Sequence, residues 1–373
     1  MDFNLSDEQQ DLRTLAAQIL EGELSTERLK EVDAGPDRFD RELWRTLAAA
    51  GLLGVAVPEA HGGLGYGFLE AAVVLEQIGR TVAPVPYLAT VVLGGLPIAW
   101  FGTDAQQSRY LPGLAAGETV CTAALVEFGA DPHAPRTTAR RDGSGWVLDG
   151  VKECVPAGTV ADAILVPART DDGGILLALV AAGAPGLTRE RQDTTNGDPE
   201  ARCTLVGVRV DDADVLGSPA DGAANLAWIV ERATAAQCAV MVGVCEVALR
   251  MTAEYTKTRE QFGRAIATFQ AVGQRAADAY IDTEAIRLTA WQAVWRLAEG
   301  LPATAEVAVA KFWAAEGGQR VVHAAQHLHG GMGVDRDYPL HRYFLLAKKL
   351  ELALGGATPQ LVRLGGILAA EPV

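Results

Sequence analysis

Arg259, Gln270 and the pair Gly330-Gly331 are residue types that suit a large phosphorylated ligand. The guanidinium group of Arg259 is planar and always charged, and it can form two parallel hydrogen bonds with a phosphate group. The amide of Gln270 can both donate and accept hydrogen bonds. Gly330 and Gly331 have no Cβ atom, so a ligand can come close to their backbone. Two alternatives stay open: Arg259 could form a salt bridge at a helix end, and the glycines could simply end a helix.

Three histidines precede these glycines and suggest a second kind of chemistry. His323 and His327 are four residues apart and so share one face of a helix, as metal ligands often do, and His329 follows them. No acidic residue lies between them as in the HExxH pattern of zinc proteases. The sequence therefore predicts no metal site, and we expect these histidines to lie on the helix that leads into Gly330.

Composition limits the function classes. The chain of 373 residues is 49% apolar and 21% charged, which predicts a folded protein of two or three packed units. A net charge of −15 disfavours sequence-independent binding to nucleic acid, which requires clustered Lys and Arg. The five cysteines are odd in number and form no CxxC pair, so a disulfide framework or zinc site is not expected and a reducing cytoplasm fits.

Targeting and membrane segments are not expected either. Residues 1–7 contain neither a basic region nor the apolar region of a signal peptide. Arg, Glu or Lys interrupt the helical-looking apolar runs before they reach the roughly 18 residues that a membrane helix requires. We expect a cytoplasmic protein that does not insert into a membrane.

The order of patterns predicts three domains. Residues 1–118 are helical, beginning with a capping box at Ser6 and Gln9. Residues 119–222 contain short apolar runs separated by Asp, Gly and Pro, which predicts an antiparallel β-domain. Residues 223–373 return to helical periodicity, with interruptions near Pro302 and at Gly330. Because strands and helices do not alternate, the fold class is α+β and mainly α, and a Rossmann domain is not indicated.

Several motifs together resemble the acyl-CoA dehydrogenase family along essentially the whole chain. The N-terminal block contains a Gly-Leu-Leu-Gly-Val-Ala-Val-Pro-Glu segment at 51–59, followed by glycines at 62, 63 and 65. The C-terminal block contains R-x-Q-F-G-x-x-I-x-x-F-Q from Arg259 to Gln270 and Q-x-x-x-G-G-x-G from Gln326 to Gly333. The combination and order of the two C-terminal motifs are specific to this family.

The resemblance implies a fold, a cofactor and a reaction. The expected fold is an N-terminal helical domain, a β-barrel-like middle domain and a C-terminal four-helix bundle through which subunits associate. FAD is expected between domains and across a subunit contact. A carboxylate removes the α-proton of an acyl-CoA thioester while the β-hydride passes to the flavin, which gives a 2,3-enoyl-CoA. Electron-transfer flavoprotein is the expected electron acceptor.

The family motifs also assign site residues. The residues expected to bind FAD lie in the two C-terminal motifs: Arg259, Gln261, Phe262, Gln270, Gln326, Gly330 and Gly331. Most family members carry the catalytic base as the Glu of an E-G-T motif, but Gly355 stands at that position here. A minority place the Glu on an earlier helix directly before an Arg, and Glu231-Arg232 matches that pattern. Glu231 is therefore the expected base, and a solvated Glu near a helix start is the alternative.

The segments that hold the flavin ring in the family are altered. The family's T-E-P-x-x-G-S-D segment appears here as Val126-Glu127-Phe128-Gly129-Ala130-Asp131-Pro132. Pro156 stands in the segment that follows Lys152, where it has no N–H or hydroxyl to offer. The position of Cys154 is usually aromatic in the family; we expect a buried, inert thiol there.

The pattern of kept and altered motifs predicts an unusual oligomer. The chain most resembles the smaller subunit of actinobacterial acyl-CoA dehydrogenases that shorten steroid side chains, in segments 251–255, 270–275 and 354–358. Those enzymes are α2β2 heterotetramers with FAD at contacts between unlike subunits. Two hypotheses follow: a subunit of an acyl-CoA dehydrogenase, in a homotetramer or an α2β2 heterotetramer, and a catalytically silent scaffold that completes the FAD site of a partner chain.

Overall fold

A computed structural model describes residues 4–370 of the chain, so the part of the signal-peptide prediction that concerns residues 1–3 lies outside the described residues. The chain forms two compact units. Residues 1–29, 72–83 and 234–373 make up a helical unit, and residues 30–71 and 84–233 make up a unit that contains the β-sheet. The predicted division into three domains at 118 and 222 stays a prediction.

The predicted helical segments at the start of the chain are present. Helix α1 (Asp7–Glu23) begins with the expected capping box, in which the Ser6 hydroxyl accepts from the Gln9 backbone and the Gln9 side chain accepts from the Ser6 backbone. The helices and helical turns that follow are α2 (Thr26–Ala34), α3 (Arg41–Ala49), η1 (Leu52–Gly54), η2 (Glu59–His61), α4 (Phe68–Thr81), the π-helix η3 (Leu88–Gly95), α5 (Leu96–Phe101) and α6 (Asp104–Ala115).

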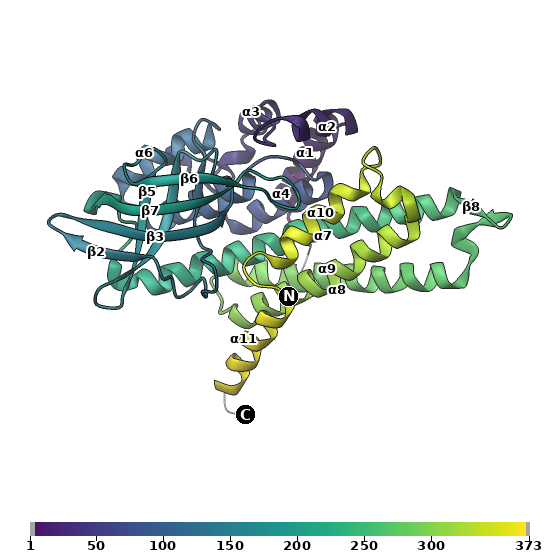
Figure 1. The fold of residues 1–373 in the computed structure, drawn as a ribbon. Coiled ribbons are helices and arrows are strands. Elements are labelled where there is room, and N and C mark those ends of the chain that lie inside the picture. Colours follow the sequence, from purple (N-terminus) through teal and green to yellow (C-terminus); the bar gives the residue numbers. More distant parts are fainter. Residues whose placement is uncertain (1–3, 371–373) are drawn as a thin grey trace. The chain divides into compact units, whose positions relative to one another are not determined.

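A seven-stranded sheet forms the middle of the chain, with strand order β1-β4-β2-β3-β7-β6 and β5 paired to β4 (Figure 1). The strands are β1 (Cys121–Ala123), β2 (Thr138–Asp142), β3 (Gly145–Val155), β4 (Ala163–Thr170), β5 (Ile175–Ala181), β6 (Leu187–Gln192) and β7 (Glu200–Asp211). The prediction of a purely antiparallel domain needs a correction, because β4 pairs with both β1 and β2 in parallel. The remaining pairs, including the long β3–β7 pair, are antiparallel.

The burial of each strand explains which strands could be predicted from the sequence. Strands β4 and β5 are buried along nearly their whole length and read as continuous apolar runs. Strand β6 (Leu-Thr-Arg-Glu-Arg-Gln) and strand β2 (Thr-Ala-Arg-Arg-Asp) are mostly exposed and charged. These two strands lacked a continuous apolar signal, although Ala139 of β2 and Leu187 of β6 pack in or against the core and backbone hydrogen bonds pair the strands to β3 and β7.

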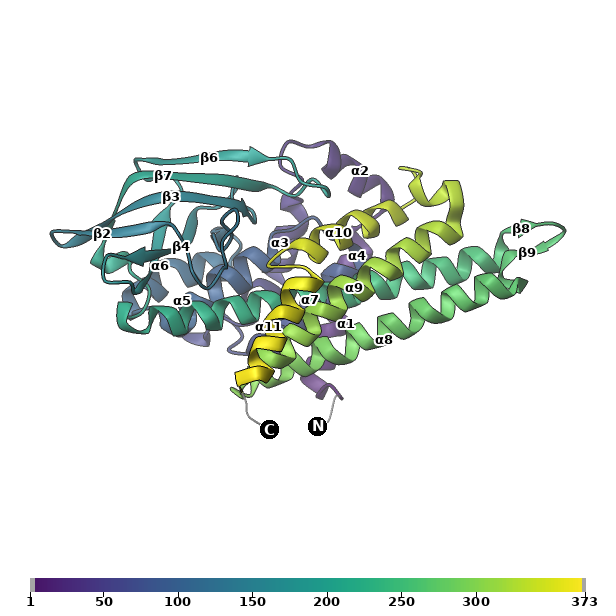
Figure 2. The same ribbon diagram turned by 60° about the horizontal axis from the view of Figure 1, so that its bottom comes forward.

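The C-terminal half forms a bundle of long helices, as expected (Figure 2). Its helices are α7 (Gly222–Thr258), α8 (Gln270–Ala298), α9 (Thr304–His329), α10 (Leu340–Leu352) and α11 (Ala357–Ala370). The predicted interruptions at Pro302 and Gly330 fall at the two ends of α9. Inside the bundle, Arg287 of α8 forms an ion pair with Glu246 of α7, with a separation of 3.2 Å.

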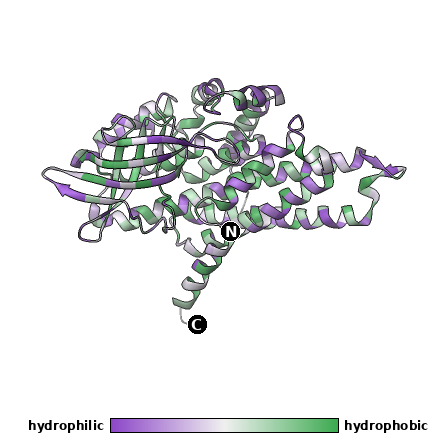
Figure 3. Ribbon diagram, in the orientation of Figure 1, coloured by the Kyte–Doolittle hydropathy of each residue, from purple (hydrophilic) through white to green (hydrophobic). Residues whose placement is uncertain are grey.

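Helix α7 is the one feature of the described residues that bears on a membrane. It is long and apolar enough to cross a bilayer by length and composition, with a mean hydropathy of 1.3 in its most apolar window. That window is 78% buried inside the protein, which is the pattern of a core helix. The apolar surface that remains exposed is concentrated elsewhere, for example on α11, which is coloured largely hydrophobic in Figure 3.

Candidate functional site

Four of the predicted FAD residues lie in a short connection at one end of the bundle. Strands β8 (Glu260–Gln261) and β9 (Arg264–Ala265) form a hairpin that links α7 to α8 (Figures 1 and 2). The turn residues Phe262 and Gly263 both have positive φ, 55° and 76°, as a two-residue type I′ turn requires. This turn places Arg259 just before the hairpin and Gln270 at the first residue of α8.

The tip of the hairpin presents an unusual apolar surface. The Phe262 side chain is 92% exposed, although its ring contacts Phe269 edge to face at 6.2 Å between centroids. The guanidinium carbon of Arg264 lies 4.1 Å from the centre of the Phe269 ring. Exposed aromatic and cationic groups of this kind are typical of surfaces that contact a ligand or another protein.

Three polar side chains of the predicted site, those of Arg259, Gln270 and Gln326, are not used by the chain itself, whereas the amide of Gln261 donates to the Glu260 carbonyl at 2.7 Å. Arg259 is exposed, and only its backbone is engaged, through hydrogen bonds of 2.8 Å with Tyr255 and Ile266. Within residues 4–370, the side chains of Arg259, Gln270 and Gln326 make no hydrogen bond or ion pair with one another or with other side chains or backbone groups. The alternative of a helix-end salt bridge for Arg259 is therefore not observed.

The end of α9 comes next to the end of α7 through an aromatic stack. The ring of His329 lies against the ring of Tyr255, with centroids 4.4 Å apart and planes 22° apart. The Nδ1 atom of His329 is 2.8 Å from the Ala325 carbonyl oxygen, and Nε2 is 3.1 Å from the Tyr338 hydroxyl. Because a carbonyl can only accept, Nδ1 carries the proton and Nε2 accepts from the tyrosine. Burial lowers the pKa of His329, which favours this neutral form.

Gly330 and Gly331 follow this buried histidine directly, and their roles differ. Gly330 ends α9 with φ 61° and ψ −134°, so the helix-ending alternative holds for this glycine. Gly331 has an ordinary φ, and a Cβ atom built on it would have no atom within 4 Å. The fold of the chain alone therefore does not require a glycine at 331. The two predicted halves of the site, Arg259–Gln270 and Gln326–Gly331, are joined by the Tyr255–His329 stack within one unit.

Glu231 lies in the interior of α7 and not near its start. It is the tenth residue of the helix and is half-buried, so the alternative of a solvated Glu at a helix start is wrong. Its neighbour Arg232 is buried, and the guanidinium carbon lies 3.7 Å from the centre of the Trp228 ring. Burial lowers the pKa of Arg232 to about 10, against the opposing charge of Glu231. Sequence analysis found Glu231 but missed the aromatic partner of Arg232.

Gly355 occupies a backbone conformation that disfavours any residue with a Cβ atom, a glutamate included. Its φ is 94°, and the preceding Leu354 also has a positive φ of 55°. A Cβ atom at 355 would lie 3.3 Å from the amide nitrogen of Gln360, which itself donates to the Leu354 carbonyl. The position of the family's usual base thus differs in backbone shape as well as in residue type.

The altered segment at Glu127 has a structural use. The carboxylate of Glu127 is buried and accepts from Lys152 at 2.6 Å, from the Thr137 hydroxyl at 2.7 Å and from the Arg136 backbone at 2.6 Å. Burial alone would raise the pKa of Glu127. The hydrogen bond and charge of Lys152, together with the hydrogen bonds from Thr137, outweigh burial, so the pKa of Glu127 is lowered. Burial lowers the pKa of Lys152, and Glu127 opposes that shift. This pair fixes both ends of loop 127–136.

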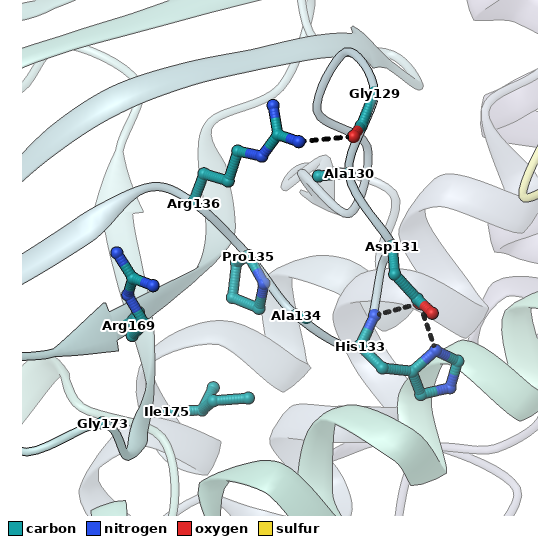
Figure 4. Close-up of a pocket in the computed structure, with 10 residues that line it drawn as sticks. All are labelled: Gly129, Ala130, Asp131, His133, Ala134, Pro135, Arg136, Arg169, Gly173 and Ile175. Atoms are coloured by element: carbon teal, nitrogen blue, oxygen red, sulfur yellow. Dashed lines mark hydrogen bonds and ion pairs between the residues drawn. The ribbon is translucent and has the colours of Figure 1, made fainter.

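Loop 127–136 lines a cationic pocket with the β4–β5 hairpin (Figure 4). Arg136 donates to the Gly129 carbonyl at 2.7 Å, and the Asp131 carboxylate lies 2.9 Å from His133 Nδ1. Arg169 contributes a second guanidinium group to the lining. Sequence analysis missed this pocket because Arg136 lies in the loop before β2 and Arg169 lies on β4, and it did not predict the parallel pairing of these two strands.

The remaining predictions for this region have mixed outcomes. Cys154 is exposed and has φ 48°, so the expectation of a buried thiol is wrong. Its position follows from the irregular pairing of β3 between Lys152 and Val155. Among the residues that the structure describes, no group of three or more His, Cys, Asp or Glu could hold a metal ion, and His323, His327 and His329 lie on α9 as expected.

The fold and the placement of these motifs define a class of protein. Family models for the N-terminal, middle and C-terminal domains of acyl-CoA dehydrogenase match residues 6–118, 126–210 and 221–361. The chain belongs to the acyl-CoA dehydrogenase family, whose members are FAD-dependent oxidoreductases that act on CH–CH groups. The predicted α+β fold of this family is confirmed.

Particular relatives are similar over the full chain. Acyl-CoA dehydrogenase FadE27 of Mycobacterium tuberculosis is 45% identical, and the alignment covers 100% of each chain. A crystal structure of the ChsE4-ChsE5 complex from M. tuberculosis contains a chain that is 46% identical, with a TM-score of 0.95 and 100% coverage of both chains. A structure of a variant of the Tcur3481-Tcur3483 steroid ACAD contains a chain that is 48% identical, with a TM-score of 0.92 and 98% coverage of both chains.

Proposed function

We propose that this chain is one subunit of an acyl-CoA dehydrogenase that converts an acyl-CoA thioester to the 2,3-enoyl-CoA. In this proposal the bundle end built from Arg259, Gln270, Gln326 and Gly331 contacts an FAD molecule held at a contact between chains. The observation that carries the proposal is that the side chains of Arg259, Gln270 and Gln326 make no hydrogen bond or ion pair within the described residues, and that the fold does not require a glycine at 331. The guanidinium group of Arg259 can bind the pyrophosphate of a dinucleotide, and the amides of Gln270 and Gln326 can form hydrogen bonds with its polar edge. Gly331 leaves room for the dinucleotide to approach the backbone.

The bound FAD would supply the hydride acceptor, and this chain would supply the proton acceptor. Glu231 takes the α-proton of the thioester in this proposal. Glu231 directly precedes Arg232 on α7, whose cation is fixed on the ring of Trp228. The backbone of Gly355 supports this assignment, because its conformation disfavours a carboxylate at the other position that the family uses.

The pocket of the β-sheet unit that Arg136 and Arg169 line is suited to the coenzyme A part of the substrate. Arg136 and Arg169 line it, and the Glu127–Lys152 pair holds its loop in place. Coenzyme A carries phosphate groups, and guanidinium groups bind phosphate through paired hydrogen bonds. We infer that this pocket accepts a phosphate of the acyl-CoA.

A relative in a two-chain complex supports a heteromer of two acyl-CoA dehydrogenase chains. Electron-transfer flavoprotein is the expected acceptor of the electrons from FAD, and the cytoplasm is the expected location. The relative described as a steroid ACAD suggests an acyl group attached to a steroid.

A second candidate function is a silent scaffold that only completes the FAD site of a partner chain. Pro156 favours it, because the backbone at that position has no N–H for a flavin ring.

A count of bound FAD tests the proposal. The chain is purified alone and together with a second acyl-CoA dehydrogenase chain that co-purifies with it, and flavin absorbance is compared with protein concentration for each oligomeric state. We expect the isolated monomer to lose FAD and the assembled oligomer to retain it. A monomer that holds one FAD per chain would contradict a site between chains. An assembly that holds FAD but oxidises no acyl-CoA after loss of the partner's own base would favour the scaffold.

A further inference from the structure

The chain that follows α9 turns back onto the last turn of that helix. The turn η7 (Gly330–Val334) begins where α9 ends, and Gly333 is buried whereas the other four residues of η7 are exposed. The backbone N–H of Gly330 donates to the Gln326 carbonyl. The turn η7 therefore starts against Gln326, the residue of α9 whose amide we place in the proposed FAD site.

The far end of this segment is also joined to α9. The Tyr338 backbone N–H donates to the Asp335 carbonyl at 3.2 Å, and the Tyr338 hydroxyl donates to Nε2 of His329 at 3.1 Å. His329 is buried and lies on the last turn of α9. Segment 330–338 is thus attached to the helix on both sides of Gly333, which leaves η7 little room to move away.

Gly333 is required for reasons of space and not of backbone conformation. Its φ is not in the positive range, in contrast to the φ of 61° at Gly330. A Cβ atom built on Gly333 would lie 2.8 Å from the carbonyl oxygen of Gln326 and 3.1 Å from its Cα and Cγ atoms. Non-bonded heavy atoms pack favourably at about 3.5–4.0 Å, so a residue with a Cβ atom would push Gln326 or η7 aside. Gly331 has no such neighbour.

The contact at Cγ bears on the direction of the Gln326 side chain. The χ1 torsion places Cγ, and each staggered χ1 value sends the amide in a different direction. Packing of η7 against Cγ therefore restricts the rotamers that remain open. The Gln326 amide makes no hydrogen bond within residues 4–370, so the packing of its stem sets where the amide points.

We propose that Gly333 is a positioning residue, which aims the Gln326 amide at the FAD by leaving the space that Cγ needs. This inference rests on the proposed function and adds a residue that acts through Gln326 and not by touching the cofactor. A side chain with few open rotamers loses little conformational entropy when it binds a ligand. The three glycines of the motif then differ in role: Gly330 ends α9, Gly331 leaves room for FAD, and Gly333 orders the glutamine side chain.

A double-mutant cycle on FAD affinity tests this role. Flavin fluorescence titration of the apo assembly measures the dissociation constant of FAD for wild type, Gly333→Ala, Gln326→Ala and the double variant. We expect Gly333→Ala to weaken binding on the order of 10-fold in the wild-type background, but by less than about 2-fold when Gln326 is already alanine. Gly22→Ala, at an exposed glycine of α1 with open space around it, is the control and should bind FAD as wild type does.

Equal losses in both backgrounds would indicate a general effect on the fold and would overturn the positioning role, as would an unchanged affinity in Gly333→Ala. If Gly333→Ala fails to assemble, Gln326→Asn decides instead. Asparagine keeps the amide but shortens its reach by one carbon, so we expect it to weaken binding as much as Gln326→Ala does. Wild-type affinity in Gln326→Asn would overturn the proposal.

The result for Gln326→Ala alone distinguishes this proposal from the proposed function. An affinity that Gln326→Ala leaves unchanged would remove Gln326 from the FAD site and would contradict the proposed function as well. A loss in Gln326→Ala without coupling to Gly333→Ala would overturn only the positioning role.

Discussion

Tyr255 stacks on His329 at 4.4 Å between ring centroids, and this contact joins the two sequence motifs that identify the family. Tyr255 lies one turn before Arg259, and His329 directly precedes Gly330. The stack thus fixes the end of α7, just before the first motif, against the end of α9, within the second motif. A ligand that touches both motifs would meet two elements whose separation is already set.

Replacing Tyr255 with alanine should weaken this junction. We expect the free energy of unfolding to fall by about 1–2 kcal/mol, because an aromatic contact and part of a half-buried ring are lost. We also expect FAD to be lost more readily from the assembled protein. Urea unfolding and flavin retention after gel filtration measure the two effects. Tyr255→Phe keeps the ring and serves as the control; if Phe and Ala behaved alike, the stack would not matter.

Arg259→Gln should affect the cofactor and not the fold. The Arg259 side chain makes no contact that the described chain needs, so the melting temperature should stay unchanged. Loss of a charged fork to a pyrophosphate should weaken FAD binding on the order of 10-fold to 100-fold, measured by flavin fluorescence titration of the apo assembly. Arg275→Gln, an exposed arginine further along α8, is the matched control. Equal affinities for wild type and Arg259→Gln would exclude this arginine from the site.

Glu231→Gln isolates the proposed base. Glutamine keeps the size and hydrogen-bonding capacity of the side chain but cannot take a proton at neutral pH. We expect kcat to fall on the order of 10²–10⁴-fold while FAD content stays unchanged, because general-base catalysis contributes that much. Stopped-flow bleaching of the flavin by substrate reports the step directly. Unchanged bleaching would assign proton removal to another group and would favour the scaffold.

Gly355→Glu should not restore the family's usual base. At φ 94° a residue with a Cβ atom is strained, and we expect a loss of about 1–2 kcal/mol in the free energy of unfolding. The double variant Glu231→Gln/Gly355→Glu should therefore remain as inactive as Glu231→Gln alone. Recovery of activity in the double variant would show that the 354–356 backbone adapts, contrary to this account.

The buried Lys311 should give the stability of the helical unit a distinctive pH dependence. Its ammonium group donates to Gln237 at 3.3 Å and to the Leu350 carbonyl. Burial lowers its pKa from 10.5 to about 8, with Cys238 and Glu351 opposing the shift. Between these two pH values the unfolded chain binds the proton and the folded chain does not, so the free energy of unfolding rises with pH.

Lys311→Met removes this titration. The stability of the wild type relative to the variant should therefore increase from pH 8 toward 10.5, by up to roughly 3 kcal/mol. Urea unfolding of both proteins at several pH values measures the difference. Lys257→Met, which removes an exposed lysine, should show no such trend. If the difference in free energy of unfolding between wild type and Lys311→Met did not change with pH, the lysine would keep its ordinary pKa in the folded protein.

Local signals in the sequence predicted much of the fold. The capping box at Ser6, the glycine after α9 and the proline before it are short-range signals, and the structure has helix ends at each. Strands β4 and β5 were predicted because burial makes them continuously apolar. Strand β6 was not, because it is largely polar and its place depends on pairing with β7.

The site was predictable only where it lies in contiguous motifs. Arg259 and Gln270 belong to one motif, and the hairpin between them is local. The stack of Tyr255 on His329 and the pairing of Glu127 with Lys152 join residues that are far apart in the sequence. No pattern of composition or period predicts such contacts, because they depend on how separate elements pack.

The most direct test is the distance from the Arg259 guanidinium group to the nearest phosphate oxygen of FAD in an experimental structure of the FAD-loaded assembly. We expect a hydrogen-bond distance, about 3 Å, to an FAD held mainly by another chain. An FAD bound wholly within one chain, or an Arg259 that faces solvent with no cofactor nearby, would contradict it.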